Sequence, residues 1–595
     1  MINTQDYLFE IGFEEFPAKL LTSAALHIQN QLETLLKKEA FSYGQTKIFA
    51  TPRRIAIHIQ NLADQQPSKQ IEKRGPAIQA AFDANQNPMP ALLGFAKSIG
   101  VEVSALHKIS TPKGEWLGYC SSEPGLPLTQ MLPKLIEQTL SSMPAPKKMR
   151  WSNQKYLFIR PVKWLTSVYG SELLPLSLFG LTASCATVGH RVHHPAPLKI
   201  DHPKNYAHIL DKQGFVIADF QKRKSLILDK AKSQIDLYCE KLIISESLLD
   251  EVTGLVEYPE ALRCAFPTEF LQVPQEALVS TMETNQKYFP IYDHNNALKA
   301  GFVVITNLQS TNPRAIIEGN EKVVRPRLSD AQFFFEKDKE KDAAFFNGKL
   351  KVLIFQAKLG SVADKTDRVA AIAKSIAKKI EPEHHALHQE AHQAGMLSKA
   401  DLATSMVGEF PEMQGVMGYY LAKHWREPDS VATAIKEQYL PRFAEDALPA
   451  TPLGAIVSLA DKIDTLVGIF ATGAIPTGDK DPFGLRRAML GVLRILLEKN
   501  YALDLKEIFH IAQKALLTKN PGSYAQDSGR TIHFKATDMG SEPQKNSYTK
   551  ESISSNDEAR FLYALFQTCA ARNFCSPQPV IISCSSFSVK SKRNG

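Results

Sequence analysis

Two sequence patterns divide the chain, and the change between them limits the folds it can adopt. Before about residue 350, short runs with the two-residue period of strands, such as Ile55–Ile59 and Gly301–Ile305, alternate with amphipathic helical patterns. The helical patterns include Leu20–Lys38 and Phe220–Lys232. From Lys351 to Lys519, Ala-rich helical segments follow one another with few strand signals. The sequence therefore predicts an α+β, multidomain protein in which mixed N-terminal and middle modules precede an all-helical domain.

The length of 595 residues allows about three to five domains. We predict an N-terminal α+β region over 1–190, a middle α+β region over 191–345, a helical domain over 346–520 and an atypical tail over 521–595. The tail contains 13 Ser and three of the seven Cys, and it has little periodicity. The helices expected in the helical domain are Ala370–Lys379, Ala400–Met406, Val431–Gln438 and Leu485–Leu497.

Composition narrows the class of protein. The content of 44% hydrophobic and 22% charged residues is typical of a soluble globular chain, and the net charge of +8 permits an anionic partner without requiring one. The cysteines show neither a zinc motif nor a disulfide framework, and the acidic N-terminus does not suit a secretory signal. The most apolar stretch, Leu453–Ile475, contains Asp461, Lys462 and Asp464, which disfavours a membrane span. We therefore expect a cytoplasmic protein without a membrane partner.

The clearest electrostatic feature is the acid-free stretch Lys147–Lys163, KKMRWSNQKYLFIRPVK. Its cations alternate with aromatic residues, which suits RNA because cations pair with phosphates and flat rings stack on unpaired bases. The alternative is a strand pair whose rings face the core while its lysines are solvated. The candidate RNA contacts are Lys147, Lys148, Arg150, Trp151 and Lys155, with weaker candidates at Arg53 and Arg54 in a turn and at Arg325 and Arg327 in GNEKVVRPRLSD.

Two histidine clusters are candidate metal ligands. In Gly189–His194 no cysteine or carboxylate lies close by to complete a ligand set, so packing and turn formation are favoured. His384, His388 and His392 recur every four residues on one helix face, where a surface helix without a metal is favoured.

The helical region contains the pair Ala400-Asp401 and, sixty residues later, LADKID around Asp461. These segments resemble the HD superfamily of metal-dependent phosphohydrolases, in which a His, a His-Asp pair and a final Asp surround a metal. Ala400 stands where the paired His belongs, and the loss of a metal ligand disfavours hydrolysis. We expect Asp401 and Asp461 to mark a degenerate HD-like domain without a metal. An HD-type phosphohydrolase remains an alternative function.

No nucleotide-binding motif occurs in the required strand-turn-helix context. The turn-rich segment Pro476–Phe483 precedes a predicted helix, and its backbone amides could hold a phosphate. A helix start with Asp481 as cap and Pro482 in the first turn explains the segment equally well.

Together these segments closely resemble the β subunit family of the bacterial two-subunit glycyl-tRNA synthetase. The matching stretches follow the family's order and cover about Asp6 to Asn520. They are EIGFEEFPAKLL (Glu10–Leu21), ATPRRIA (Ala50–Ala56), GFAKSIGV (Gly94–Val101), KKMRW (Lys147–Trp151), RPVKWL (Arg160–Leu165), GHRV (Gly189–Val192), EVTGLVEYP (Glu251–Pro259), NQKYFP (Asn285–Pro290), GNEKVVRPRLSDAQFFFEKD (Gly319–Asp338), KADLATSMVGEFPEMQGVMG (Lys399–Gly418), LADKIDTLVGIF (Leu459–Phe470) and PTGDKDPFGLRR (Pro476–Arg487).

The resemblance implies a subunit of an α2β2 glycine--tRNA ligase. In that family the α subunit forms glycyl-adenylate from glycine and ATP with Mg, whereas the β subunit takes part in recognising tRNA(Gly). It therefore implies an α subunit and tRNA(Gly) as partners, no DNA, no cofactor bound by this chain, and no adenylate-forming site in it. The basic candidates above become candidate tRNA contacts.

The chain departs from the family pattern at Phe13, Phe16, Asp479 and Gly484, which are local differences. The family continues into a helical anticodon-binding domain similar to that of arginyl-tRNA synthetase, and no such pattern follows Asn520. The ending reads like translation in a shifted frame, which is a hypothesis. An inactive, truncated β subunit is the corresponding alternative.

Overall fold

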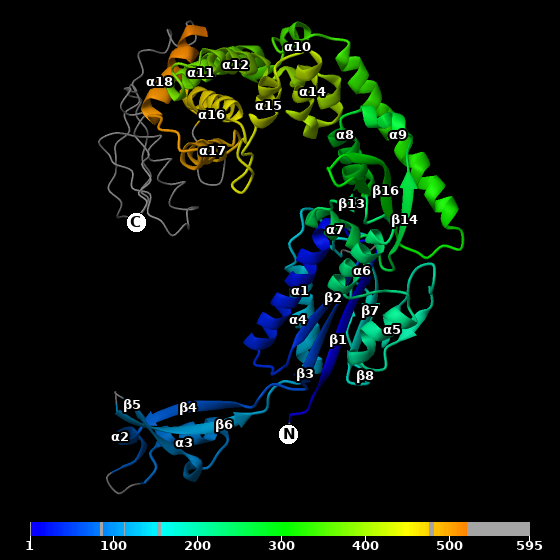
Figure 1. Ribbon diagram of the computed structural model, residues 1–595. Helices are drawn as coiled ribbons and strands as arrows, with labels where there is room; N and C mark the ends of the chain where they lie inside the picture. The colour runs from blue at the N-terminus through cyan, green and yellow to red at the C-terminus, as the bar shows by residue number, and fades with distance from the viewer. Residues whose placement is uncertain (1, 84–86, 112–113, 152–155, 475–480, 520–595) are drawn as a thin grey trace, which may run out of the picture. The chain divides into compact units, whose positions relative to one another are not determined.

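The computed structural model describes residues 2–83, 87–111, 114–151, 156–474 and 481–519 (Figure 1). The chain forms two compact units, each built from two stretches: Met1–Phe266 with Met282–Val323, and Pro267–Thr281 with Val324–Gly595. The first unit mixes sheets and helices and the second is mainly helical, so the predicted α+β, multidomain class is confirmed. The boundaries at 190, 345 and 520, and the HD-like nature of the helical part, stay predictions.

The first unit is organised around an antiparallel sheet of strand order β2-β3-β1-β7-β8. Side chains of a strand alternate between its two faces. Accordingly, Tyr7, Phe9 and Ile11 of the central strand pack into one core, whereas Leu8 packs into another. The first core is covered by α1 and α4 and the second by α5 (Figure 1). The bounds are β1 (Thr4–Phe13), β2 (Thr46–Thr51), β3 (Arg54–Ala63), β7 (Val162–Tyr169), β8 (Glu172–Leu173), α1 (Ala18–Lys38), α4 (Leu128–Ser141) and α5 (Tyr206–Lys212).

A small module is inserted between β3 and α4. It has a three-stranded sheet of order β4-β6-β5 and a core of Ala81, Leu92 and Leu117. Its elements are β4 (Lys69–Ala77), α2 (Ile78–Ala81), α3 (Pro90–Ile99), the 3-10 helix η1 (Val103–Ala105), β5 (His107–Thr111) and β6 (Gly114–Glu123).

A second sheet of the first unit has the order β13-β15-β16-β14 and packs against α6 and α7. Its elements are α6 (Phe220–Lys232), β13 (Lys241–Leu242), α7 (Glu246–Thr253), β14 (Glu260–Ala265), the π-helix η4 (Thr281–Gln286), β15 (Phe289–Tyr292) and β16 (Leu298–Thr306). Short connecting elements are β9 (Ser177–Leu178), β10 (Leu181–Thr182), β11 (Ala186–Val188), β12 (Pro197–Lys199) and the 3-10 helix η2 (Pro203–Asn205).

The second unit packs its helices around α16 (Pro452–Ala471), which is buried along most of its length. The long helix α9 (Pro313–Lys339) starts in the first unit and continues into the second. The other elements are η3 (Thr268–Gln272), α8 (Gln275–Ser280), α10 (Ala343–Lys349), β17 (Ile354–Gln356), β18 (Gly360–Ser361), α11 (Val362–Ile380), α12 (His385–Leu397), η5 (Ala400–Ala403), α13 (Ser405–Glu409), η6 (Pro411–Met413), α14 (Val416–His424), α15 (Asp429–Glu437), α17 (Leu485–Glu498) and α18 (Leu505–Lys519).

Most helices and strands expected from periodicity are present, but the helix expected over Ala400–Met406 is wrong. The structure has the 3-10 helix η5 followed by α13, with Thr404 extended between them. The Thr404 hydroxyl accepts a hydrogen bond from the Val407 amide (3.1 Å) and so caps α13. Threonine caps a helix better than it continues one, which explains the break.

Candidate nucleic-acid interface

The basic stretch after α4 doubles back on itself. Met149 and Phe158 exchange two backbone hydrogen bonds of 2.9 and 3.2 Å. The candidate Lys155 lies outside the described residues. Lys147 and Arg150 are exposed and form no hydrogen bond or ion pair with another described residue, whereas the Lys148 ammonium donates to the Ser141 carbonyl (3.1 Å). The exposed cations are therefore available to an anionic partner.

The aromatic residues of the same stretch pack inward. Trp151 is half-buried, with its ring centroid 5.9 Å from that of Phe179 and 6.3 Å from that of Tyr156. Phe158 is buried and lies 5.4 Å from Phe179. This packing matches the alternative in which the rings face the core and the cations face solvent. Phosphate pairing by the cations is thus better supported than base stacking by Trp151.

The other end of the stretch contacts Glu14 and Glu15. Lys163 forms an ion pair with Glu14 (3.0 Å), and Arg160 donates to the Glu15 carbonyl (2.8 Å). The Lys163 hydrogen bond is the main cause that holds the pKa of Glu14 below its ordinary value. The charge of Lys163 is therefore neutralised, whereas Arg160 contacts a backbone carbonyl and Lys147 and Arg150 pair with no described acidic residue.

The structure corrects the candidate Arg54, which has no exposed surface. Its guanidinium donates to the Glu257 carboxylate (3.1 Å from Nη2) and to the Thr187 hydroxyl (3.0 Å). Burial opposes the charge, but the carboxylates of Glu257 and Glu10 outweigh it and raise the pKa of Arg54. A side chain inside the core cannot contact RNA, so Arg54 is a structural residue.

The neighbouring candidate Arg53 keeps 15% of its side chain exposed. Its Nη1 donates to the Gly189 carbonyl (3.4 Å) and lies 3.7 Å from the Glu257 carboxylate. The guanidinium also lies over the Trp164 ring, 5.6 Å from the centroid. The Arg53 guanidinium therefore already has partners within the protein. Burial lowers the pKa of Arg53.

The buried charges next to Arg54 were missed from the sequence. Glu10 accepts hydrogen bonds from Trp164, Thr187 and Tyr206. The signal was present, because Glu10 interrupts the apolar run YLFEIGF and a charge inside a buried strand requires partners. Glu257 carries no comparable pattern, since its partners are far away in the sequence.

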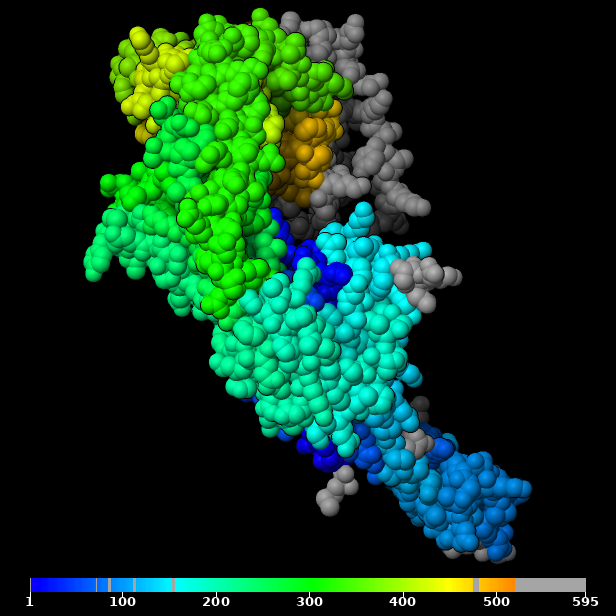
Figure 2. Space-filling view, turned by 90° about the vertical axis from the view of Figure 1, so that its right-hand side faces the viewer, coloured from blue at the N-terminus to red at the C-terminus, as the bar shows by residue number. Residues whose placement is uncertain are grey.

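The candidates Arg325 and Arg327 lie on α9, which runs along the surface in the view of Figure 2. Both side chains are exposed, and neither pairs with a described acidic residue. Val324 and Leu328 are buried and fix the helix in place. The two arginines therefore present charge on α9 that no described acidic residue neutralises.

Asp401 and Asp461, the two HD-like positions, are both mostly enclosed within the second unit. Asp461 forms ion pairs of 3.1 Å with Lys365 and with Lys399. Burial opposes ionisation of Asp461, but these two ammonium groups hold its pKa well below the ordinary value. Asp401 accepts a hydrogen bond from the Gly415 amide (2.5 Å), and burial raises its pKa to about 6.

This arrangement does not suit a divalent metal. The carboxylate that would be a ligand, Asp461, is paired on both oxygens with ammonium groups, and Ala400 supplies no donor. Positive side chains therefore supply the charge that balances Asp461. No group of three or more His, Cys, Asp or Glu side chains within the described ranges is placed to hold a metal.

The two histidine clusters make local contacts. His190 accepts hydrogen bonds at Nδ1 from the amides of Val192 and His193 (both 3.2 Å), which fixes a turn. His388 is buried and its Nε2 lies 2.7 Å from the Glu381 carbonyl.

The start of α17 is the candidate phosphate site. The Asp481 carboxylate accepts from the amides of Leu485 and Arg486 (2.9 and 3.0 Å), so these donors are already satisfied. Asp481 thus bonds the first amides of α17, but the N-cap residue is Gly484 and Pro482 lies before the helix, so the predicted helix start at Asp481 and Pro482 is wrong. The segment 475–480 lies outside the described residues.

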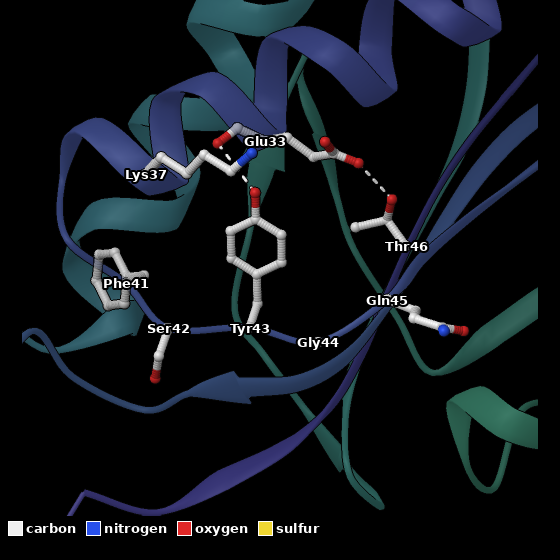
Figure 3. A pocket seen from close by; sticks show the side chains of 8 residues that line it. All are labelled: Glu33, Lys37, Phe41, Ser42, Tyr43, Gly44, Gln45 and Thr46. Carbon is white, nitrogen blue, oxygen red and sulfur yellow. Dashed lines mark hydrogen bonds between the residues drawn. The ribbon is translucent and has the colours of Figure 1, made fainter.

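An open hollow of about 560 Å³ lies between α1 and the start of β2 (Figure 3). Tyr43 donates to the Glu33 carbonyl (3.3 Å), and Thr46 donates to the Glu33 carboxylate. Figure 3 shows these side chains turned toward α1, whereas Ser42 and Gln45 point away. The polar groups of Glu33 are therefore used to fix the loop, and the hollow shows no set of converging groups for a ligand.

Comparisons with known proteins define the class. Curated relatives from Hahella chejuensis, Pseudomonas fluorescens and Haemophilus influenzae carry the name glycine--tRNA ligase beta subunit, so they are subunits of an aminoacyl-tRNA ligase. The first is 47% identical over 513 residues, 86% of this chain and 74% of the relative. The second is 47% identical over 518 residues, which are 87% of this chain and 74% of the relative. The third is 45% identical over 507 residues, which are 85% of this chain and 73% of the relative.

A family model described as glycyl-tRNA synthetase beta subunit matches residues 7–555. The chain therefore belongs to the glycyl-tRNA synthetase beta subunit family, as the sequence motifs predicted. None of the helices in the part of the chain that the structure describes combines the length and apolar character needed to cross a bilayer.

Proposed function

We propose that the chain is the tRNA-binding, non-catalytic subunit of a glycine--tRNA ligase. It binds tRNA(Gly) in the cytoplasm so that an α subunit can attach glycine, using ATP with Mg. The observation that carries this proposal is the family membership over most of the chain. The exposed cations at Lys147, Arg150, Arg325 and Arg327 support tRNA binding, because they have no acidic partner among the described residues.

The paired charges around Asp461 support the absence of catalysis in this chain. A general base or a metal ligand needs a carboxylate that is free to act. Lys365 and Lys399 occupy the Asp461 carboxylate. The same contacts argue against the HD-type phosphohydrolase, which no observation favours.

A reconstituted glycylation assay tests whether the α subunit, and not this chain, carries the catalytic activity. The purified chain alone should charge no tRNA, and activity should appear when the cognate α subunit is added. Charging by the chain alone would contradict the non-catalytic role. No activity with both subunits present, despite complex formation, would favour the inactive form of the β subunit.

Charge reversal tests the RNA surface. The variant Lys147→Glu/Lys148→Glu/Arg150→Glu should weaken tRNA binding. The plot of log affinity against log salt should become less steep by about 2, because each lost phosphate contact reduces the magnitude of its slope by about 0.7–0.9. A matched control reverses three exposed lysines elsewhere in the first unit, Lys199, Lys212 and Lys232. If both triple variants weaken binding equally, net charge and not this surface determines affinity.

A further inference from the structure

Four exposed apolar side chains lie within ten residues of one another in the second unit, one in the first turn of α10 and three at the start of β17 and just before it. We call them the β17 patch: Phe345, Val352, Leu353 and Ile354, with exposed fractions of 41, 79, 37 and 78%. Single exposed apolar residues are common, but three consecutive exposed aliphatic residues form an apolar stretch on the surface. Such a patch costs free energy in water unless another surface covers it.

The strand at the patch, β17, has one edge without a pairing partner among the described strands. β17 pairs with β18 on one side, through Ile354 and Ser361, and no described strand pairs with its other side. The chain before β17 is held by hydrogen bonds from the Val362 amide to the Leu353 carbonyl (2.7 Å) and from the Ala363 amide to the Leu350 carbonyl (3.3 Å). An unpaired strand edge bearing apolar side chains is suited to pairing with another chain.

Cations border the patch. Lys349 and Lys341 lie over the Phe345 ring, with ammonium-to-centroid distances of 4.7 and 5.7 Å, and Lys351 and Lys358 are exposed nearby. Residues 341–361 contain four lysines and one acidic residue, Asp342. A partner that complements this surface has an apolar segment with acidic neighbours.

The composition of the patch favours a protein over RNA. RNA recognition uses aromatic rings for stacking and cations for phosphates, whereas Val352, Leu353 and Ile354 offer nothing to a base or a phosphate. Aliphatic surface with a polar rim is typical of the contact between permanently associated subunits.

We propose that the β17 patch is the docking surface for the α subunit of the same ligase, which covers it with an apolar strand bordered by acidic side chains. This inference rests on the proposed function. It extends that function by naming the residues on this chain that hold the partner.

Binding of the full-length chain to the purified α subunit tests the proposal. The variant Val352→Glu/Ile354→Glu should weaken the complex at least about tenfold, because it places charges in an apolar contact. The control Leu173→Glu/Val192→Glu replaces two exposed apolar residues of the first unit (44 and 59% exposed) and should bind as the wild type does. Since the replaced residues are exposed, the unfolding temperature of both variants should equal that of the wild type.

Two further measurements sharpen the test. Hydrogen exchange of peptides over residues 350–357 should slow when the α subunit is added. The variant Lys349→Glu/Lys351→Glu should weaken the complex, whereas Lys349→Arg/Lys351→Arg should not.

Each outcome has a defined meaning. If the wild type binds the α subunit and the Val352→Glu/Ile354→Glu variant binds equally well, the docking inference is overturned and the proposed function stands. If the wild type does not bind the α subunit, the proposed function itself fails. If the variant instead converts a self-associated chain to a monomer with unchanged affinity for the α subunit, the patch contacts a second copy of this chain.

Discussion

At the scale of single residues, Arg54 connects parts of the first unit that are far apart in sequence. Its guanidinium bonds Thr187 and Glu257, and Thr187 in turn donates to Glu10. Each carboxylate is buried, so each needs the positive charge to remain ionised inside the protein. The turn that suggested an RNA contact from the sequence therefore serves folding at this position.

Replacement of Arg54 should destabilise the first unit strongly. Arg54→Met keeps the length of the side chain but leaves Glu10 without its cation and Glu257 with only the more distant Arg53 (3.7 Å), which should cost about 3–5 kcal/mol. Hydrogen exchange in peptides from β1 and β3 should accelerate accordingly. The control Arg53→Met removes a partly exposed neighbour and should have a much smaller effect; equal effects would contradict the role assigned to the buried pair.

A second residue-scale prediction concerns Asp401 and pH. Burial raises the folded-state pKa of Asp401 to about 6 from 3.8, so the folded state binds this proton more tightly than the unfolded state does. Above pH 6 the buried Asp401 carboxylate therefore lowers the free energy of unfolding by its full amount. As the pH falls through 6 this penalty decreases, and below the unfolded-state pKa the free energy of unfolding has risen by up to about 3 kcal/mol.

Between pH 7.5 and pH 5, acidification should thus raise the protection factors of the helices around Asp401, which compare each exchange rate with the intrinsic rate of the amide at the same pH. The Asp401→Asn variant carries no titrating proton and should lose this pH dependence. A variant that keeps the wild-type dependence would show that another group is responsible. Asp461 does not interfere in this range, because Lys365 and Lys399 hold its pKa well below the ordinary value.

At the scale of strands, β1 and β7 are joined through a close contact at Gly12. A Cβ atom at this position would lie 1.9 Å from the Trp164 ring. Gly12→Ala should therefore displace Trp164, disturb its hydrogen bond to Glu10 and cost about 1–3 kcal/mol. A lower unfolding temperature of the first unit would show this.

The matched control is Gly94→Ala in α3, where a Cβ atom would meet nothing within 4 Å. Alanine favours the helix by about 0.5–1 kcal/mol over glycine, so this variant should be neutral or slightly stabilised. Destabilisation by both changes would indicate a general intolerance of alanine and not the Trp164 contact.

The spacing of apolar residues predicted the bounds of helices whose buried face is regular. The pattern over Phe220–Lys232 coincides with α6, and Leu20–Lys38 falls within two residues of α1. It failed at Ala400–Met406, because side-chain capping by Thr404 is a local hydrogen bond that apolar spacing does not report.

At the scale of the whole molecule, α18 contributes to the core of the helical unit. Ile508, Phe509, Ala512 and Leu516 are buried against α11 and α16. Each large side chain contributes about 1.5–3 kcal/mol by burial. A chain that ends after Lys519 keeps these contacts and is the reference for a shorter chain without α18, since a loss of 1 kcal/mol lowers the unfolding midpoint by about 2–4 °C.

A chain that ends after Tyr501 loses α18 and should unfold at a clearly lower temperature or precipitate. Circular dichroism during heating measures both variants. If the chain ending after Lys519 also unfolds early, residues beyond it contribute to the stability of the helical unit.

The candidate site was less predictable than the fold. The exposed positions of Lys147, Arg150, Arg325 and Arg327 agree with their proposed role, since charged residues without a buried partner remain at the surface. Arg54 and Glu257 could not be placed from the sequence, because 203 residues separate them and only the fold brings them together. The β17 patch was missed for a similar reason: an apolar run such as VLIF reads as core until the structure shows it exposed.

The chain passes between the two units three times, after Phe266, Thr281 and Val323. A recombination event with a single breakpoint therefore cannot transfer either unit intact to another gene, because part of each would be left behind. Inheritance of the two units as one block is the expected evolutionary result, even though each has its own core. By contrast, the module between β3 and α4 is one continuous insertion, so it can be gained, lost or exchanged without interrupting the rest of either unit.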